Sequence, residues 1–214
     1  MVERSMIIEK VTAFITRQKR DEEILLILHP HAGIQIPAGT VEKGENVEEE
    51  LIREIMEETG LRKTKIKSYL GFKEKKLPSN EFILSDKTKV YSRPTSTSFN
   101  WAELRKGITV TSNRICGEYT QITYNEYDRF PNPQYIIYQI IGWVPTAALS
   151  REIRRHFFHV ITDEEVQDEW EIFTDNHKFR LFWSSLVNLP NIVDPQYKWL
   201  DYVQYDLGYK FESP

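Results

Sequence analysis

The chain has 214 residues, and its 28 Lys and Arg against 32 Asp and Glu give a net charge of −4. Hydrophobic residues make up 40% and aromatic residues 13%, which excludes a disordered chain because ample apolar material can be buried. The mildly acidic balance excludes a global basic field of the kind that holds nucleic acid. Cys116 is the only cysteine, so neither an intrachain disulfide nor a cysteine zinc cluster can form.

No targeting segment is predicted. The chain begins with an early acid and no long apolar core, unlike a signal peptide. The densest apolar run, residues 24–28, is far shorter than the ~20 residues that span a bilayer. Together with the single cysteine, which suits a reducing compartment, this predicts a cytoplasmic protein without membrane contact.

The predicted elements begin with strands at residues 6–16, 23–29 and 34–36, followed by a loop at 37–40. Further strands are predicted over 66–72, 81–91, 108–111, 118–124, 134–144, 154–161 and 179–183. The segment 92–107 is polar and rich in Ser and Thr, which predicts a long loop. Residues 162–170 are predicted as a loop or short helix, and 194–205 as a closing helix.

Residues 46–59 give the clearest helix signal in the chain. Asn46 is a good N-cap, and Glu49 three residues later completes a capping box. Gly60 follows the last turn, where a left-handed cap is favoured. The predicted apolar stripe consists of Val47, Leu51, Ile52, Ile55 and Met56.

These elements predict an α/β fold, with a mixed sheet packed between helices in an α/β/α sandwich. We expect a single domain over residues 1–214. The segment at about 78–145 is predicted to be an insertion after the helix that reads the substrate.

The helix carries an unusual set of acids. Glu54, Glu57 and Glu58 are spaced i, i+3 and i+4, so their carboxylates project from one face. Two of them occupy the last turn, where the helix dipole disfavours acids by ~0.3–1 kcal/mol each at exposed sites. Arg53 is the only cation on the helix. A matched divalent cation would offset these costs, and hard oxygen ligands favour Mg²⁺ or Mn²⁺ over zinc.

The segment around this helix contains a longer motif. Residues 39–61 fit G-x5-E-x7-R-E-U-x-E-E-x-G-U, where U is a bulky aliphatic residue, at all nine specified positions. The matching residues are Gly39, Glu45, Arg53, Glu54, Ile55, Glu57, Glu58, Gly60 and Leu61. This pattern resembles the Nudix box of the Nudix hydrolase superfamily. Glu50 and Leu51 depart from the small residues found there in many relatives.

The resemblance implies roles for the box residues. Glu54, Glu57 and Glu58, with the carbonyl of Gly39, would bind Mg²⁺ or Mn²⁺ on a diphosphate. One of these three glutamates, with Glu54 and Glu57 as the catalytic candidates, or an acid from a later loop would act as the general base toward water. Glu45 and Arg53 would pair and hold the loop against the helix, and Glu50 could add a ligand. Gly39 is also expected to permit a sharp turn between strand and helix.

The resemblance also implies an activity. We expect a pyrophosphohydrolase that cleaves the diphosphate bond of a nucleoside diphosphate linked to another group, such as ADP-ribose or a nucleotide sugar. A nucleoside triphosphate or an RNA 5′ end is the less favoured substrate. Three rivals stay open: a nucleotide-sensing module without catalysis, an isoprenoid diphosphate isomerase using Cys116, and a metal-free structural protein.

Other residues have weaker claims to function. Glu164, Glu165, Asp168 and Glu169 are candidate bases outside the helix, and Arg114, Arg129, Arg154 and Arg155 are unranked candidates for phosphate contact. His156 and His159 lie three apart on a strand and so on opposite faces, which argues against a metal pair. His29 and His31 are expected to form a plain turn. The aromatic stretch comprises Tyr119, Tyr124, Tyr127, Phe130, Tyr135 and Tyr138, and is compatible with sheet packing, base stacking or a homodimer.

Overall fold

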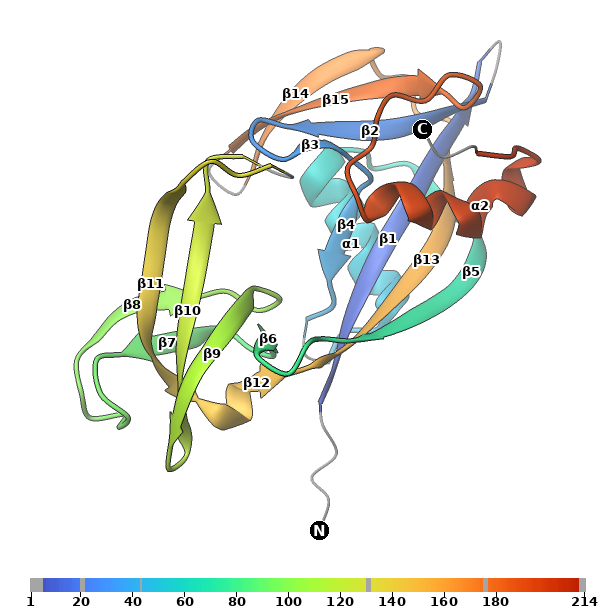
Figure 1. Ribbon diagram of the computed structural model, residues 1–214. Coiled ribbons are helices and arrows are strands. Elements are labelled where there is room, and N and C mark those ends of the chain that lie inside the picture. Colours follow the sequence, from blue (N-terminus) through green and yellow to red (C-terminus); the bar gives the residue numbers. More distant parts are fainter. Residues whose placement is uncertain (1–5, 20–21, 43, 130–131, 175–176, 212–214) are drawn as a thin grey trace. The chain divides into compact units, whose positions relative to one another are not determined.

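The computed structural model describes residues 6–19, 22–42, 44–129, 132–174 and 177–211 (Figure 1). The chain divides into two compact units. The box unit comprises 10–72, 129–132 and 155–214 and holds the Nudix-like motif. The second unit comprises 1–9, 73–128 and 133–154, and the insertion predicted at about 78–145 falls in it except for 129–132. Each unit is described by itself.

Sheet A has eight strands and a central order β14-β15-β2-β1-β13-β5, with β3 paired to β2 and β4 paired to β1. Its strands are β1 (Ile7–Gln18), β2 (Glu22–His29), β3 (Gly33–Gln35), β4 (Ala38–Thr40), β5 (Thr64–Lys76), β13 (Glu152–Thr162), β14 (Glu169–Thr174) and β15 (His177–Ser185). The predicted strands at 6–16, 23–29, 34–36, 66–72, 154–161 and 179–183 are therefore confirmed with shifted ends. The predicted loop at 37–40 is wrong in part, because β4 continues the ladder beside β1.

Helices cover both faces of sheet A. Helix α1 (Val47–Thr59) buries Leu51 and Ile55 against alternate β1 residues that include Val11. Helix α2 (Leu200–Leu207) follows the 3₁₀ helix η2 (Gln196–Trp199) and packs on the opposite face with Phe14 of β1. Because successive strand residues point to opposite faces, one strand supplies both cores. This confirms the predicted α/β class, with helices on both sides of the sheet.

Sheet B forms the second unit, with seven strands in the order β12-β6-β9-β10-β11-β7-β8. Its elements are β6 (Glu81–Leu84), β7 (Thr88–Tyr91), β8 (Asn100–Leu104), β9 (Thr109–Cys116), β10 (Tyr119–Tyr127), β11 (Ile136–Pro145), the 3₁₀ helix η1 (Thr146–Ala148) and β12 (Leu149–Ser150). The strand predicted over 81–91 is split into β6 and β7. The loop predicted over 92–107 contains β8, which pairs with β7 and buries Leu104 against Val90.

A buried polar chain ties α2 to sheet A. The Nε2 of His159 lies 2.9 Å from the hydroxyl of Thr16, and its Nδ1 lies 3.2 Å from a carboxylate oxygen of Asp206. Asp206 also accepts a hydrogen bond from Ser68. Neutral histidine satisfies both contacts if Nδ1–H donates to Asp206 and Nε2 accepts from Thr16. Burial lowers the pKa of His159, against the opposing effect of Asp206.

We expect stability to fall as the pH drops below about 6.5, the ordinary histidine value. The lowered pKa means that the folded state binds a proton at His159 less readily than the unfolded state. The loss therefore runs from 6.5 down to the folded pKa, with a slope of at most ~1.4 kcal/mol per pH unit. Asp206, whose pKa is lowered mainly by Ser68, keeps its contribution until the pH falls further.

Chemical denaturation of the wild type and of His159→Gln between pH 5 and 7.5 measures this slope. Glutamine retains a donor and an acceptor but does not titrate, so its profile should be flatter. His156→Gln is the control because His156 lies on the same strand and contacts Tyr69 instead. Equal slopes in the wild type and His159→Gln would contradict the assignment.

Candidate active site

The ends of α1 are set by the residues predicted from the sequence. The side chain of Asn46 accepts hydrogen bonds from the backbone N–H groups of Glu48, at 3.0 Å, and Glu49, at 2.9 Å. Gly60 adopts φ = 77°, and its N–H donates to the carbonyl of Met56 at 3.0 Å. These caps satisfy backbone groups at both helix ends and so fix the last turn, which carries the box glutamates.

The buried stripe of α1 is narrower than predicted. Leu51 and Ile55 are buried, whereas Ile52 and Met56 are 40% and 49% exposed. The helix therefore contacts the sheet through one line of residues.

Gly39 gives Glu54 the space to lie against β4. A Cβ atom at Gly39 would be 2.1 Å from Cδ of Glu54 and 2.2 Å from one of its carboxylate oxygens. With a Cβ atom there, Glu54 would have to move away from β4, so its present position requires glycine at residue 39. The turn expected at Gly39 is absent, because the residue lies within β4 and pairs with Val11 of β1. Gly39 instead lets the side chain of Glu54 lie close to the backbone of β4.

Arg53 lies at the centre of the acidic face. Its guanidinium bonds the carboxylate of Glu57 at 2.8 Å and that of Glu50 at shorter range. The predicted pair with Glu45 is present at 3.6 Å, and Glu54 lies at 3.8 Å. One cation thus holds four carboxylates in place, and the loop before α1 is tied to the helix through Glu45.

Glu50 is an anchor of the loop. Its side chain is fully buried and accepts a hydrogen bond from the backbone N–H of Glu42 at 3.2 Å. Burial first, and then the proximity of Glu45, raise the pKa of Glu50 to about 8. Its contacts with Arg53 and Glu42 oppose that rise. Glu50 therefore replaces the small residue of many relatives because it anchors the loop before α1. Its side chain lies beneath the solvent-exposed acidic face of the helix.

The other box acids differ in their surroundings. Glu58 accepts a hydrogen bond from the backbone N–H of Ala38 at 3.0 Å. Desolvation raises the pKa of Glu54, although Arg53 opposes the rise. Glu57 is the most accessible, with its side chain 50% exposed. The crevice between β4 and α1 leaves no room for a water molecule. A bound cation would therefore lie at the outer rim of these carboxylates.

The part of the chain that the structure describes holds no group of three His, Cys, Asp or Glu side chains already arranged as a metal cage. The donors themselves fit a hard divalent cation, since all are carboxylates crowded on one helix face. Arg53 bonds one carboxylate oxygen of Glu57 at 2.8 Å, so a cation that took this oxygen would have to displace the pair.

The candidate bases outside the helix are mostly engaged elsewhere. Glu164 accepts the backbone N–H groups of Arg62 and Lys63, both at 2.8 Å, and these bonds lower its pKa. Asp168 pairs with Arg17 and Lys19, and Glu169 pairs with Arg180. Glu165 is exposed and lines a pocket of about 520 Å³ at the C-terminal end of α1.

The histidine predictions agree with the structure. His156 contacts Tyr69, at 2.9 Å between the phenol oxygen and Nδ1, whereas His159 joins the buried chain at α2. The Nδ1 of His29 accepts backbone N–H groups of His31 and Ala32, both at 3.0 Å, as in a plain turn.

The structure separates the candidate arginines. Arg154 pairs with Glu74 at 2.7 Å and Glu9 at 3.2 Å, and Arg114 bonds Gln121 at 3.1 Å. Arg155 instead points to the α2 face of sheet A, where its guanidinium lies 4.3 Å from the centre of the Trp199 ring. Lys10, which sequence reasoning missed, lies beside it on β1. No local pattern marks Lys10, because its neighbours come from distant strands.

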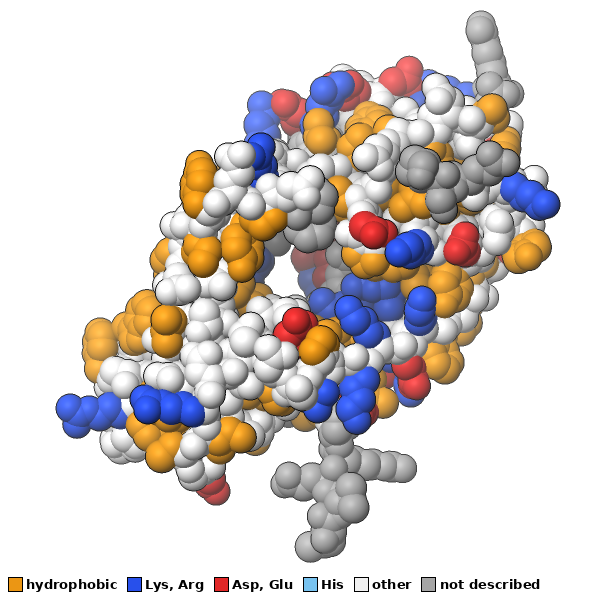
Figure 2. All heavy atoms as spheres, in the orientation of Figure 1, with side chains coloured by type: hydrophobic (Ala, Val, Ile, Leu, Met, Phe, Trp, Pro, Cys, Tyr) orange, Lys and Arg blue, Asp and Glu red, His pale blue; other side chains and the backbone are white. Residues whose placement is uncertain are grey.

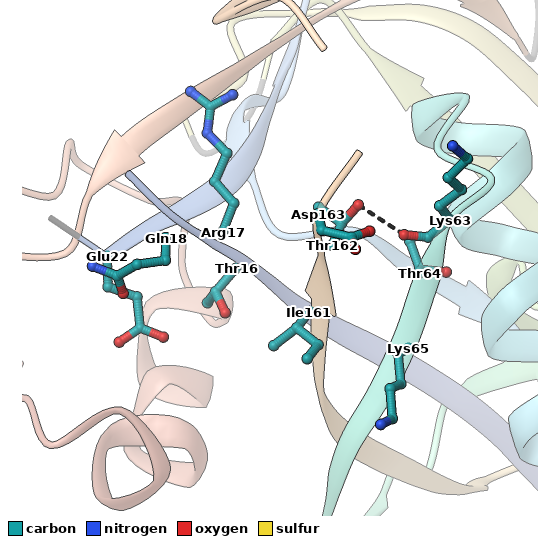
Figure 3. Close-up of a pocket in the computed structure, with 10 residues that line it drawn as sticks. All are labelled: Thr16, Arg17, Gln18, Glu22, Lys63, Thr64, Lys65, Ile161, Thr162 and Asp163. Atoms are coloured by element: carbon teal, nitrogen blue, oxygen red, sulfur yellow. Dashed lines mark hydrogen bonds between the residues drawn. The ribbon is translucent and has the colours of Figure 1, made fainter. Parts of the chain in front are cut away.

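A pocket of about 460 Å³ lies between β1, β5 and β13. Figure 3 shows that the charged ends of Arg17, Glu22, Lys63 and Lys65 point in different directions instead of converging on one point. Such an arrangement offers no focused site for an ion.

In the second unit, the predicted aromatic stretch is partly packed. Tyr124 packs against the core of sheet B, and Tyr119 contacts Tyr91 with ring centres 6.1 Å apart. Tyr127, Tyr135 and Tyr138 are 44%, 62% and 49% exposed. Phe130 lies outside the described residues. Cys116 is exposed on β9.

We expect Gly39→Ala to destabilise the protein by ~1–3 kcal/mol, because the added methyl group overlaps Glu54. The double variant Gly39→Ala/Glu54→Ala should recover most of this loss, since all three atoms nearest the added Cβ belong to Glu54. Urea denaturation of the four proteins gives the coupling energy, which should exceed ~1 kcal/mol. Additive losses would refute the contact.

The comparisons agree with this geometry. A family model described as the NUDIX domain matches residues 7–105, which include β1, β4 and α1. No curated protein matches the chain. Among the described residues, no helix is long and apolar enough to cross a membrane. The domain match and the complete box on α1 support the Nudix hydrolase superfamily, whose members hydrolyse phosphoric anhydride bonds.

Proposed function

We propose that this hydrolase is a metal-dependent enzyme that cleaves the diphosphate bond of a nucleoside diphosphate linked to another moiety, such as ADP-ribose or a nucleotide sugar. The observation that carries the proposal is the acidic rim of α1. Glu54, Glu57 and Glu58 lie on one face of the last turns, with Glu54 held against the backbone of Gly39. Every residue of the Nudix box is present.

Glu54, Glu57 and Glu58, with the carbonyl of Gly39, are the proposed ligands of Mg²⁺ or Mn²⁺. Such a cation supplies charge neutralisation at the diphosphate and lowers the pKa of water. Glu57 is the best candidate for the general base toward water, since it is the most exposed of the three, and Glu54 is the alternative. Arg53 and Glu45 are positioning residues that set the angle of these carboxylates.

Cleavage of a nucleoside triphosphate or an RNA 5′ end is the less favoured alternative within the same chemistry. The box residues contact phosphates and do not distinguish the group beyond them. A nucleotide-sensing module is the alternative from another class, and the complete set of box glutamates argues against it. We place the protein in the cytoplasm and leave a homodimer as an open proposal.

A hydrolysis screen with Mg²⁺, and separately with Mn²⁺, tests the proposal. The substrates are ADP-ribose, nucleotide sugars, dinucleoside polyphosphates, CDP-alcohols, nucleoside triphosphates and 5′-triphosphate RNA. We expect one class to be cleaved, with activity lost in EDTA. Glu57→Gln should lower kcat by about 10²–10⁴-fold, the range for loss of a general base.

Glu48→Gln is the matched control, because it removes the same charge from the exposed first turn of α1. It should retain activity within a factor of about two. If no substrate is cleaved but nucleotides raise the melting temperature, the hydrolase proposal fails for these substrates and the sensing module replaces it.

A further inference from the structure

Arg155 is a recessed cation without a carboxylate partner. It is only partly exposed, and no described acid lies within ion-pair distance of it. Burial lowers its pKa to about 10, although the nearby Glu58 opposes that effect. Its neighbour Arg154, on the opposite face of β13, holds two carboxylates. Because buried charges are costly unless paired, the arrangement around Arg155 calls for an anion.

The guanidinium of Arg155 is nevertheless held in a fixed orientation. Its Nη1 donates to the carbonyl of Val11 at 3.1 Å and to the hydroxyl of Thr12 at 3.0 Å. The ring of Trp199 lies over its plane, with 4.3 Å to the ring centre. Its Nε and Nη2 form no hydrogen bond with any residue that the structure describes. The N–H groups of Nε and Nη2 are thus positioned and available to a ligand.

The two anchors of Arg155, the Val11 carbonyl and the Thr12 hydroxyl, belong to residues that pair with β4 of the Nudix box. Val11 pairs with Gly39, against which Glu54 lies. Thr12 pairs with Ala38, whose N–H donates to Glu58. Arg155 contacts this stretch from the α2 face, whereas α1 packs on the other face, and Glu58 lies close enough to oppose the lowered pKa of Arg155. A ligand at the acidic rim that passes the edge of β4 would therefore contact both groups.

Lys10 adds a second cation at the same place. It precedes Val11 on β1 and lies opposite Thr40 of β4. Burial, and next the charge of Arg155, lower the pKa of Lys10 to about 8, while Glu54 opposes the shift. Two like charges are therefore close together, and both are only partly exposed. Figure 2 shows Lys and Arg side chains gathered on the sheet next to α2.

We propose that Arg155 and Lys10 form an anion subsite that binds a phosphate group of a pyrophosphate-containing ligand beside the Nudix glutamates. This inference rests on the proposed function, because the bound group would be one of the two phosphates of the bond to be cleaved. The free edge of the guanidinium presents Nε–H and Nη2–H in the fork that suits a phosphate. Thr12 and Trp199 keep that fork in place, and Lys10 supplies a point charge.

Titration calorimetry with sodium pyrophosphate tests the subsite. EDTA keeps the box free of metal, and pH and ionic strength are held constant. We expect the wild type to bind pyrophosphate, and Arg155→Met to bind at least about tenfold more weakly, since a charge-assisted fork is lost. Arg155→Lys should be intermediate, because it retains charge without the fork. Arg154→Gln is the matched control and should bind like the wild type.

Kinetics with the cleaved substrate give a second readout. Arg155→Met should raise KM at least about tenfold with a smaller change in kcat, because ground-state and transition-state contacts to this phosphate are alike. Circular dichroism checks that each variant is folded. If Arg155→Met does not fold, Arg155→Lys provides the test. Pyrophosphate binding by Arg155→Lys that equals binding by Arg154→Gln would overturn the subsite.

The outcomes separate this inference from the proposed activity. Glu57→Gln should lower kcat by about 10²–10⁴-fold without weakening metal-free pyrophosphate binding. Hydrolysis with unaltered binding and KM in both Arg155 variants would overturn the subsite and leave the enzyme assignment in place. Absence of hydrolysis in the wild type, with pyrophosphate binding that depends on Arg155, would overturn the activity and support the subsite. Absence of pyrophosphate binding by the wild type overturns the subsite.

Discussion

The contact between Glu54 and the backbone of Gly39 is the constraint on which the rest of the site depends. It requires a position without a side chain, a helix whose last turn reaches β4, and a ladder that keeps β4 beside β1. The caps at Asn46 and Gly60 then set where the helix begins and ends. Other side chains of α1 also have defined partners: Glu58 bonds the backbone of β4, Glu50 bonds the loop before the helix, and Arg53 pairs with the carboxylates around it.

A short stretch of β1 links opposite charges. On one side, the glutamates of α1 reach it through the paired residues of β4; on the other, Arg155 of β13 binds it directly. The proposed cation site and the proposed anion site therefore share one hydrogen-bonded ladder, which would hold their separation constant. Such a rigid spacing favours a ligand with several phosphate groups over one isolated anion, because both sites can be filled without rearranging the sheet.

Local sequence features predicted α1 and the box, because capping and i, i+4 spacing act within a few residues. The narrow stripe could not be predicted, since whether Ile52 and Met56 are covered depends on how much sheet lies beneath them. Strand β8 was not predicted, because its segment is polar and it is stabilised by pairing with β7, which lies elsewhere in the sequence. The four arginines were equivalent in the sequence, and only the tertiary positions of acids separate Arg155 from Arg154.

Arg53 also affects the protein in the absence of a metal ion. The acids of α1 already have an internal counter-ion, so their mutual repulsion is moderated before any metal arrives. The fold therefore has a counter-ion for these acids without metal, in contrast to small metal-stabilised domains that unfold in chelator. In the proposed reaction, the metal ion would bind together with the nucleotide and leave with the products.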